Sequence, residues 1–134
     1  MENEREILDM IILELAWHNG ILTVIREDDH VLRRFGQVDV VKVSNGSALE
    51  IWRQKADEIW AVISGEVRFS LEDRREDSPS GGVNVELELS KDVPQAILVP
   101  FGVTCKVSST GDAILLRIGT HQNHAHAEDQ IPFL

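Results

Sequence analysis

The chain has 134 residues, of which 43% are hydrophobic and 27% charged, as is typical of a globular domain of this length. Its net charge of −10 argues against a nucleic-acid ligand or an anionic membrane surface, because both attract basic proteins. A single cysteine, Cys105, excludes an internal disulfide, and no apolar run is long enough to cross a bilayer. We therefore predict one domain over residues 1–134, in a cytoplasmic protein that binds neither nucleic acid nor membrane.

Short strands are predicted along almost the whole chain, and only residues 2–10 have a weak helical pattern. The predicted strands are 11–17, 21–26, 38–44, 48–53, 59–63, 67–71, 83–89, 96–99, 103–107 and 113–118. Asn19-Gly20 and Asn45-Gly46 lie between apolar runs, and Asn-Gly favours the tight turns of β-hairpins. We therefore predict one hairpin at each of these pairs.

Alternation along the chain indicates strands that are buried on one face. Val67, Phe69 and Leu71 are separated by polar residues, and the same period of two continues through residues 83–89. Residues 74–82 contain Ser-Pro-Ser-Gly-Gly and predict a loop, which its small residues allow to be mobile. Many short strands separated by turns are typical of an all-β sandwich or barrel.

Several short motifs have an informative spacing. Phe35-Gly36-Gln37 contains a Phe-x-Gln motif, and Gly65-Glu66-Val67 is followed by Asp73, Arg75 and Ser78-Pro79. Leu89-Ser90 then lies ten residues before Pro100, which begins a Pro-x-Gly motif. From about residue 35 to 120, this order resembles the dTDP-4-dehydrorhamnose 3,5-epimerase family of cupins. The resemblance implies a single jelly-roll barrel (a double-stranded β-helix), a nucleotide-sugar ligand and a homodimer.

The resemblance also assigns the family's catalytic positions to residues of this chain. The histidine base would correspond to Trp52, the catalytic lysine to Glu58, and a second histidine to Cys105. The tyrosine acid would correspond to Leu116 or Arg117, and the chain contains no tyrosine. Epimerisation beside a ketone requires a base to remove a proton and an acid to return it on the other face. An indole cannot act as that base, so we predict no 3,5-epimerase activity.

The metal-binding positions of cupins are also substituted. They would fall at Trp52, Gln54, Glu58 and Cys105, and this set lacks the donors that iron or manganese requires. Zinc bound by Cys105 and Glu58 would lack a third strong ligand. We therefore predict a barrel without a metal or other cofactor.

A separate group of histidines follows the last predicted strand. His121, His124 and His126 contain enough imidazole nitrogens to chelate zinc or nickel, but their spacing matches no specific motif. A polar tail on the surface or against a partner subunit is the simpler interpretation.

The candidate ligand site is the mouth of the barrel. It comprises Trp52, Gln54, Glu58, Trp60 and Cys105, with Arg75 near the rim. Alternate residues of a strand share a face, so Trp52 should point with Gln54, and Glu58 with Trp60. Glu58 is the candidate catalytic residue and the others are candidate ligand-binding residues. Large side chains that fill the barrel are the structural alternative.

Three functions are compatible with these residues, and whether the protein is an enzyme stays open. The first, which we favour, is a metal-free cupin that binds a nucleotide sugar or a similar small polar ligand without 3,5-epimerisation. The second is a nucleotide-sugar epimerase or isomerase that uses a buried Glu58 as its base. The third is a non-catalytic dimeric partner subunit. We expect a homodimer because the apolar run 11–15 would otherwise form an exposed sheet edge.

Overall fold

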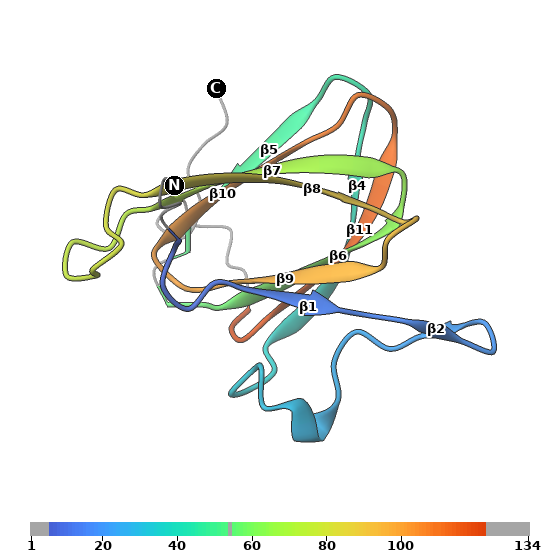
Figure 1. The fold of residues 1–134 in the computed structure, drawn as a ribbon, viewed down its shortest axis with the longest axis horizontal. Helices are drawn as coiled ribbons and strands as arrows, with labels where there is room; N and C mark the ends of the chain where they lie inside the picture. Colours follow the sequence, from blue (N-terminus) through green and yellow to red (C-terminus); the bar gives the residue numbers. More distant parts are fainter. Residues whose placement is uncertain (1–5, 54, 123–134) are drawn as a thin grey trace, which may run out of the picture.

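The computed structural model describes residues 6–53 and 55–122, which form two antiparallel sheets that face each other in a barrel (Figure 1). One sheet has five strands in the order β1-β9-β6-β11-β4, and the other has four in the order β5-β10-β7-β8. The strands are β1 (Ile11–Glu14), β2 (Trp17–His18), β3 (Ile21–Leu22), β4 (Gln37–Val43), β5 (Ala48–Ile51), β6 (Glu58–Ser64), β7 (Glu66–Asp73), β8 (Asn84–Ser90), β9 (Gln95–Val99), β10 (Val103–Ser108) and β11 (Ala113–Gly119). The predicted all-β jelly-roll fold is confirmed.

The described residues contain one short 3-10 helix, η1 (Glu27–Asp29), and no α-helix. The weak helical prediction for residues 2–10 is therefore wrong for residues 6–10, and residues 2–5 lie outside the described part of the chain. No helix in the described residues has the length and apolar composition that a membrane crossing requires.

The two Asn-Gly turns form as predicted, but only one of them closes a hairpin. Asn19 and Gly20 both have positive φ and join β2 to β3, which pair over only two residues each. This hairpin projects from the barrel (Figure 1). Asn45-Gly46 instead connects β4 of one sheet to β5 of the other, so the predicted second hairpin is wrong. Strand β1 does not pair with β3. It pairs with β9 and forms an edge of the five-stranded sheet.

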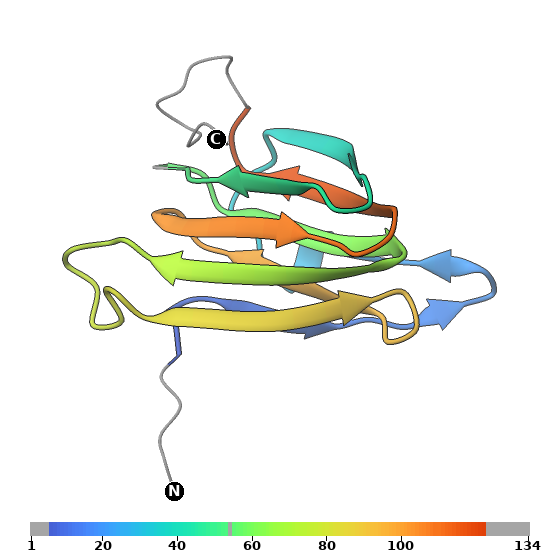
Figure 2. The ribbon, with the colours of Figure 1, turned by 90° about the horizontal axis from the view of Figure 1, so that it is seen from above.

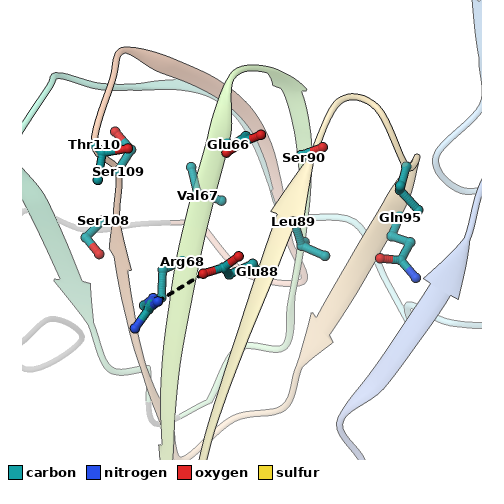
Figure 3. A pocket seen from close by; sticks show the side chains of 11 residues that line it. Glu66, Val67, Arg68, Glu88, Leu89, Ser90, Gln95, Ser108, Ser109 and Thr110 are labelled. Carbon is teal, nitrogen blue, oxygen red and sulfur yellow. Dashed lines mark hydrogen bonds and ion pairs between the residues drawn. The ribbon is translucent and has the colours of Figure 1, made fainter.

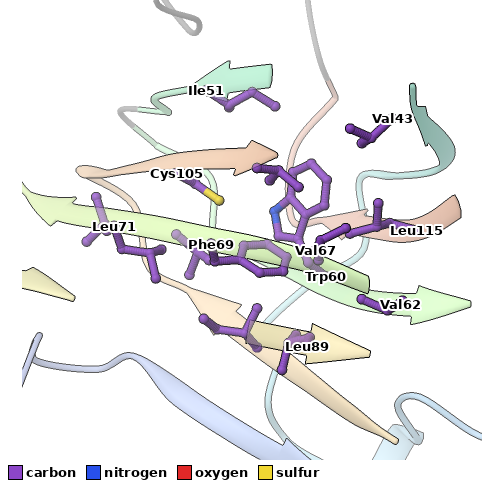
Figure 4. Packing of buried hydrophobic residues seen from close by; sticks show 14 of the residues in the cluster. Val43, Ile51, Trp60, Val62, Val67, Phe69, Leu71, Leu89, Cys105 and Leu115 are labelled. Carbon is purple, nitrogen blue, oxygen red and sulfur yellow. The ribbon is translucent and has the colours of Figure 1, made fainter. Parts of the chain in front are cut away.

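The main core lies between the two sheets. Val67, Phe69 and Leu71 of β7 point inward as their alternation predicted, and all three are buried. Trp60 of β6 is fully buried and meets Phe69 edge to face, with 6.1 Å between the ring centroids (Figure 4). Seen from above, the strands of the four-stranded sheet lie over the five-stranded sheet (Figure 2). The buried side chains fill the space between the two sheets.

A second apolar cluster covers the outer face of the five-stranded sheet. Ile59 and Ala61 of β6 and Leu98 of β9 pack there against residues of the segment between β3 and β4. The contacting residues of that segment are Val24, Ile25, Val31 and Leu32. Strand β6 is consequently buried on both faces, and its continuous apolar sequence follows from this position.

Replacing Trp60 with alanine should lower the free energy of unfolding by about 3–5 kcal/mol, because a large cavity would open in a closed core. The measurement is urea denaturation followed by circular dichroism. The matched control is Trp17→Ala in the projecting hairpin, where the side chain is 52% exposed. That variant should change stability by about 0.5 kcal/mol or less. Equal losses in the two variants would contradict the packing described for Trp60.

Candidate functional site

One end of the barrel interior holds a buried charged cluster, which we call the Glu58 cluster: Arg53, Glu58, Trp60 and Arg117. Glu58 is the first residue of β6, and its side chain is 3% exposed. Its Oε2 atom accepts hydrogen bonds from Arg53 Nη1 at 2.9 Å and from Arg117 Nε at 3.0 Å. Its Oε1 atom accepts a hydrogen bond from Trp60 Nε1 at 3.2 Å. The Arg117 guanidinium also lies over the Trp60 ring, 5.4 Å from its centroid.

Strand alternation explains why these side chains meet. Glu58 and Trp60 are two residues apart on β6 and point to the same side, as predicted. Arg117 lies opposite Trp60 on β11, whereas its neighbour Leu116 packs in the outer cluster. The resemblance assigned the tyrosine acid to either Leu116 or Arg117. Of these two residues, Arg117 is the one whose side chain points into the barrel.

The interior beside Glu58 has almost no free space. A cavity of about 10 Å³ lies there. Its lining residues are Ile51, Arg53, Ala56, Glu58, Val99, Pro100, Val103 and Cys105. A cavity must reach about 10–15 Å³ to hold one water molecule. A sugar ring therefore does not fit against Glu58 in this structure, and both oxygens of its carboxylate already accept hydrogen bonds from side chains.

Trp52 does not line the cavity beside Glu58 as the predicted alternation required. Strand β5 ends at Ile51, and the residues buried there are Ile51 and Arg53, which is 5% exposed. Trp52 lies between them and is half-buried, with a buried Nε1 atom that has no hydrogen-bond partner. The alternation is thus displaced by one residue from the prediction. Gln54 lies outside the described residues.

Cys105 lies in the main core, where it is 2% exposed. Burial raises the pKa of its thiol far above the usual range, and the nearby charge of Glu58 raises that pKa further. The thiolate, which is the form that attacks electrophiles and binds metals, is therefore not populated at neutral pH.

No group of three potential metal ligands occurs among residues 6–53 and 55–122. His124 and His126 of the predicted tail cluster lie outside these ranges. His121 is described, and its Nδ1 lies 2.8 Å from Thr120 Oγ1. Burial lowers the pKa of His121, and the positive charges of Arg34 and Arg53 lower it further.

Arg75 connects the loop after β7 to the N-terminal segment. Its Nε and Nη2 atoms donate to the two carboxylate oxygens of Asp73 at 2.9 and 3.0 Å, and Nη2 also donates to the Leu8 carbonyl at 2.8 Å. Gly102 packs directly against this side chain with a positive φ, and a Cβ there would lie 2.4 Å from Arg75 Cγ. The loop that the sequence allowed to be mobile is thus braced by Arg75.

Asp73 is the buried centre of this brace. Burial opposes its ionisation, but hydrogen bonds from Arg75, Ser80 and Ser78 outweigh that effect and hold the pKa of Asp73 well below its usual range. Ser80 Oγ donates to Asp73 Oδ2 at 2.5 Å and also accepts the Leu8 backbone amide at 2.9 Å.

A ligand-sized hollow of about 500 Å³ lies on the rim beside the Glu58 cluster, and we call it the rim hollow. Its lining includes His30, Arg33, Asp57 and Phe101. Asp57 Oδ1 accepts the Phe101 backbone amide at 2.9 Å, and the Arg75 guanidinium lies 5.9 Å from the centroid of the Phe101 ring. Sequence reasoning missed this hollow. Phe101 was visible in the Pro-x-Gly motif, but His30 and Arg33 belong to an irregular segment without a pattern.

No family model matches the chain. The crystal structure of dTDP-4-dehydrorhamnose 3,5-epimerase from Sulfolobus tokodaii superimposes with a TM-score of 0.79, covering 96% of this chain and 79% of that chain at 19% identity. A second solved structure is the epimerase RmlC from Legionella pneumophila Philadelphia 1 in complex with dTDP-4-keto-L-rhamnose. It superimposes with a TM-score of 0.78, covering 95% of this chain and 73% of that chain at 19% identity. The chain has the cupin fold of the dTDP-4-dehydrorhamnose 3,5-epimerases.

The chain is also similar in sequence to a curated protein of polysaccharide biosynthesis. The spore coat polysaccharide biosynthesis protein SpsL of Bacillus subtilis (strain 168) is 31% identical over 81 residues. The match covers 60% of this chain and 54% of SpsL, so the chain spans about half the length of this relative.

Replacing Glu58 with glutamine should lower the free energy of unfolding by about 3–5 kcal/mol, because two buried guanidinium groups would lose the carboxylate that both contact. Chemical denaturation at pH 7 measures this. The control is Glu66→Gln at the exposed start of β7, which should change stability by about 0.5 kcal/mol or less. A Glu58→Gln variant as stable as the parent would show that the carboxylate is not the counter-ion described here.

Replacing Asp73 with asparagine should cost at least about 2 kcal/mol at pH 7, since hydrogen bonds to a charged group are lost. The folded-state pKa of Asp73 is below that of the unfolded chain, so its contribution is complete above about pH 4 and decreases as the pH falls. The stability difference between the parent and Asp73→Asn should therefore shrink below about pH 4. Thermal melts between pH 3 and 7 test this, with exposed Asp92→Asn as control. A difference independent of pH would contradict the assignment.

Proposed function

We propose that the protein binds a nucleotide sugar, or a related sugar phosphate, at the rim hollow, and that it does not catalyse 3,5-epimerisation. The observation that carries this proposal is a ligand-sized hollow on the rim beside a barrel interior that is filled. The fold shared with nucleotide-sugar epimerases and the sequence match to a polysaccharide biosynthesis protein support this class of ligand.

Among the described residues, the rim hollow offers one guanidinium group to a phosphate. Arg33 lines the hollow with a side chain that is 73% exposed, and its Nη2 atom lies 3.8 Å from Asp57. Guanidinium groups bind phosphate oxygens strongly, so Arg33 is the proposed contact for the diphosphate.

Other residues of the rim hollow are suited to a sugar or base. The Phe101 ring is 42% exposed and offers an apolar face for stacking, while the Arg75 guanidinium lies 5.9 Å from the ring centroid. Asp9, Asp29 and Asp57 also line the hollow and offer carboxylate oxygens to sugar hydroxyls.

The chemistry of the interior favours binding without the family's reaction. Both carboxylate oxygens of Glu58 accept hydrogen bonds, and the Cys105 thiol remains protonated. Arg117 lies at the inner position to which the resemblance assigned the tyrosine acid. The predicted role of Glu58 as a base is therefore not part of our proposal. Glu58 acts instead as the buried counter-ion that keeps the barrel end closed.

A homodimer completes the proposal. Strand β1 is an edge of the five-stranded sheet, and Ile11 and Ile12 on it are each 43% exposed. An apolar edge strand of this kind favours pairing with a second chain. The dimer and the cytoplasmic location stay predictions.

Adding dTDP-glucose should raise the melting temperature of the protein, because the ligand binds the folded state. Isothermal titration calorimetry should then show binding that Arg33→Ala and Phe101→Ala each weaken about tenfold, as expected for one lost charge-assisted or stacking contact. The matched control is Arg74→Ala, which removes a guanidinium outside the hollow.

Turnover is tested separately, by incubating the protein with dTDP-4-dehydro-6-deoxyglucose in D₂O. We expect no deuterium at C3 or C5 of the sugar, since Glu58 is engaged in its hydrogen bonds. Protein-dependent incorporation would contradict the non-catalytic part of the proposal. An absence of binding by dTDP-glucose would contradict the binding part.

A further inference from the structure

A second hollow, of about 510 Å³, lies at the end of the barrel opposite the Glu58 cluster, and we call it the distal hollow (Figure 3). It is bordered by the start of β7, the end of β8, the start of β9 and the residues that follow β10. Its volume falls within the range of about 300–1,000 Å³ that is usual for small-molecule sites. The filled core separates it from the rim hollow, and the two hollows share no lining residue.

The polar lining of the distal hollow consists largely of uncharged groups. Ser108, Ser109 and Thr110 border one side, Gln95 borders the other, and Ser90 lies between them (Figure 3). Hydroxyl groups both donate and accept hydrogen bonds, and an amide offers two donors and an acceptor. A ligand with many hydroxyl groups matches this set better than a ligand that only accepts or only donates.

Apolar atoms line the hollow between these polar sides. Val67 and Leu89, both members of the main core, and Val93 in the turn after β8 contribute to the lining. Val93 is 57% exposed. An apolar surface between polar sides suits a sugar ring, which has C–H faces and an equatorial belt of hydroxyl groups.

Hydrogen bonds to the backbone, two of them from or to side-chain hydroxyls, fix both sides of the distal hollow. The Ser109 carbonyl accepts the Gly46 amide at 3.2 Å, and the Ser109 hydroxyl donates to the Gly111 carbonyl. On the other side, the Asp92 amide donates to Ser90 Oγ at 3.0 Å, and the Lys91 amide donates to the Gly65 carbonyl at 3.2 Å. A site whose walls are already ordered loses less entropy when a ligand binds.

The charges of the distal hollow disfavour a phosphate group. Arg68 is paired with Glu88 at 2.9 Å and lies 3.5 Å from Glu86. Glu66 adds a further carboxylate to the lining. Arg68 is thus engaged by carboxylates, and no other basic residue in the described part of the chain lines the distal hollow to bind a nucleotide or sugar phosphate.

We propose that the distal hollow is a second binding site, specific for a neutral saccharide. It is independent of the nucleotide-sugar site proposed at the rim, because it lies at the other end of the barrel and shares no lining residue with the rim hollow. The protein would then bind an uncharged glycan unit at one end and a phosphorylated sugar at the other.

The test is a titration of the ¹⁵N-labelled full chain with methyl α-L-rhamnopyranoside and with maltose, followed by amide chemical shifts. We expect saturable shifts at residues 66–68, 88–90 and 108–110, without shifts at Asp57 or Phe101. Val93→Arg, which places a bulky side chain over the apolar lining of the distal hollow, should weaken this binding at least tenfold. Val40→Arg, at a 70% exposed valine on β4, should leave it unchanged. Thr110→Arg provides a second blocking variant in an exposed loop.

Two results would overturn this proposal. One is the absence of saturable shifts at these amides with both saccharides. The other is binding that survives in whichever blocking variant is folded, as judged by its amide spectrum. Shifts at the same amides on adding dTDP would contradict the charge selectivity. Because dTDP-glucose binding at the rim is measured separately, by calorimetry with the Arg33→Ala and Phe101→Ala variants, failure of either site is distinguishable from failure of the other.

Discussion

The carboxylate of Glu58 determines the structure at one end of the barrel. It receives hydrogen bonds from Arg53, which follows a strand of the four-stranded sheet, and from Arg117 in the five-stranded sheet. The interaction therefore ties the two sheets together where the jelly roll would otherwise open. Burying such charges is costly, and an apolar replacement of the whole cluster is often equally stable. What the cluster supplies is a defined geometry, because each guanidinium and the Trp60 indole has a fixed partner.

That closure is the reason why we propose a ligand site outside the barrel interior. The space beside Glu58 is about 10 Å³, whereas the rim hollow has about 500 Å³. The solved relatives share the fold at 19% identity, and a fold alone does not determine which surface binds a ligand. Phe101 and Arg33 rather than the inner strand residues are the groups accessible to a ligand. The ion pair of Asp73 and Arg75 contributes to this surface, because the Arg75 guanidinium also lies against the Phe101 ring.

Strand positions and the barrel class were predictable from local sequence, because alternation and turn residues are local signals. Which strands pair is not local: Gly46 adopts the positive φ that its Asn-Gly pair favours, yet the turn joins two sheets instead of two paired strands. The orientation of Trp52 differs from the predicted one for a related reason. A displacement of one residue reverses every side chain of a strand, and the buried residue after Ile51 is Arg53. Glu58 and Trp60 lie within a regular strand, and their shared face was predictable.

The availability of arginines is the basis on which the two proposed sites would differ. The described lining of both hollows carries more carboxylates than guanidinium groups, and the chain as a whole carries −10. Arg33 is 73% exposed and lies 3.8 Å from Asp57, whereas Arg68 lies 2.9 Å from Glu88 and 3.5 Å from Glu86. In our proposal a phosphorylated ligand therefore gains affinity only within reach of Arg33. Screening by salt should then weaken phosphate binding at the rim but leave a neutral saccharide at the distal end almost unaffected.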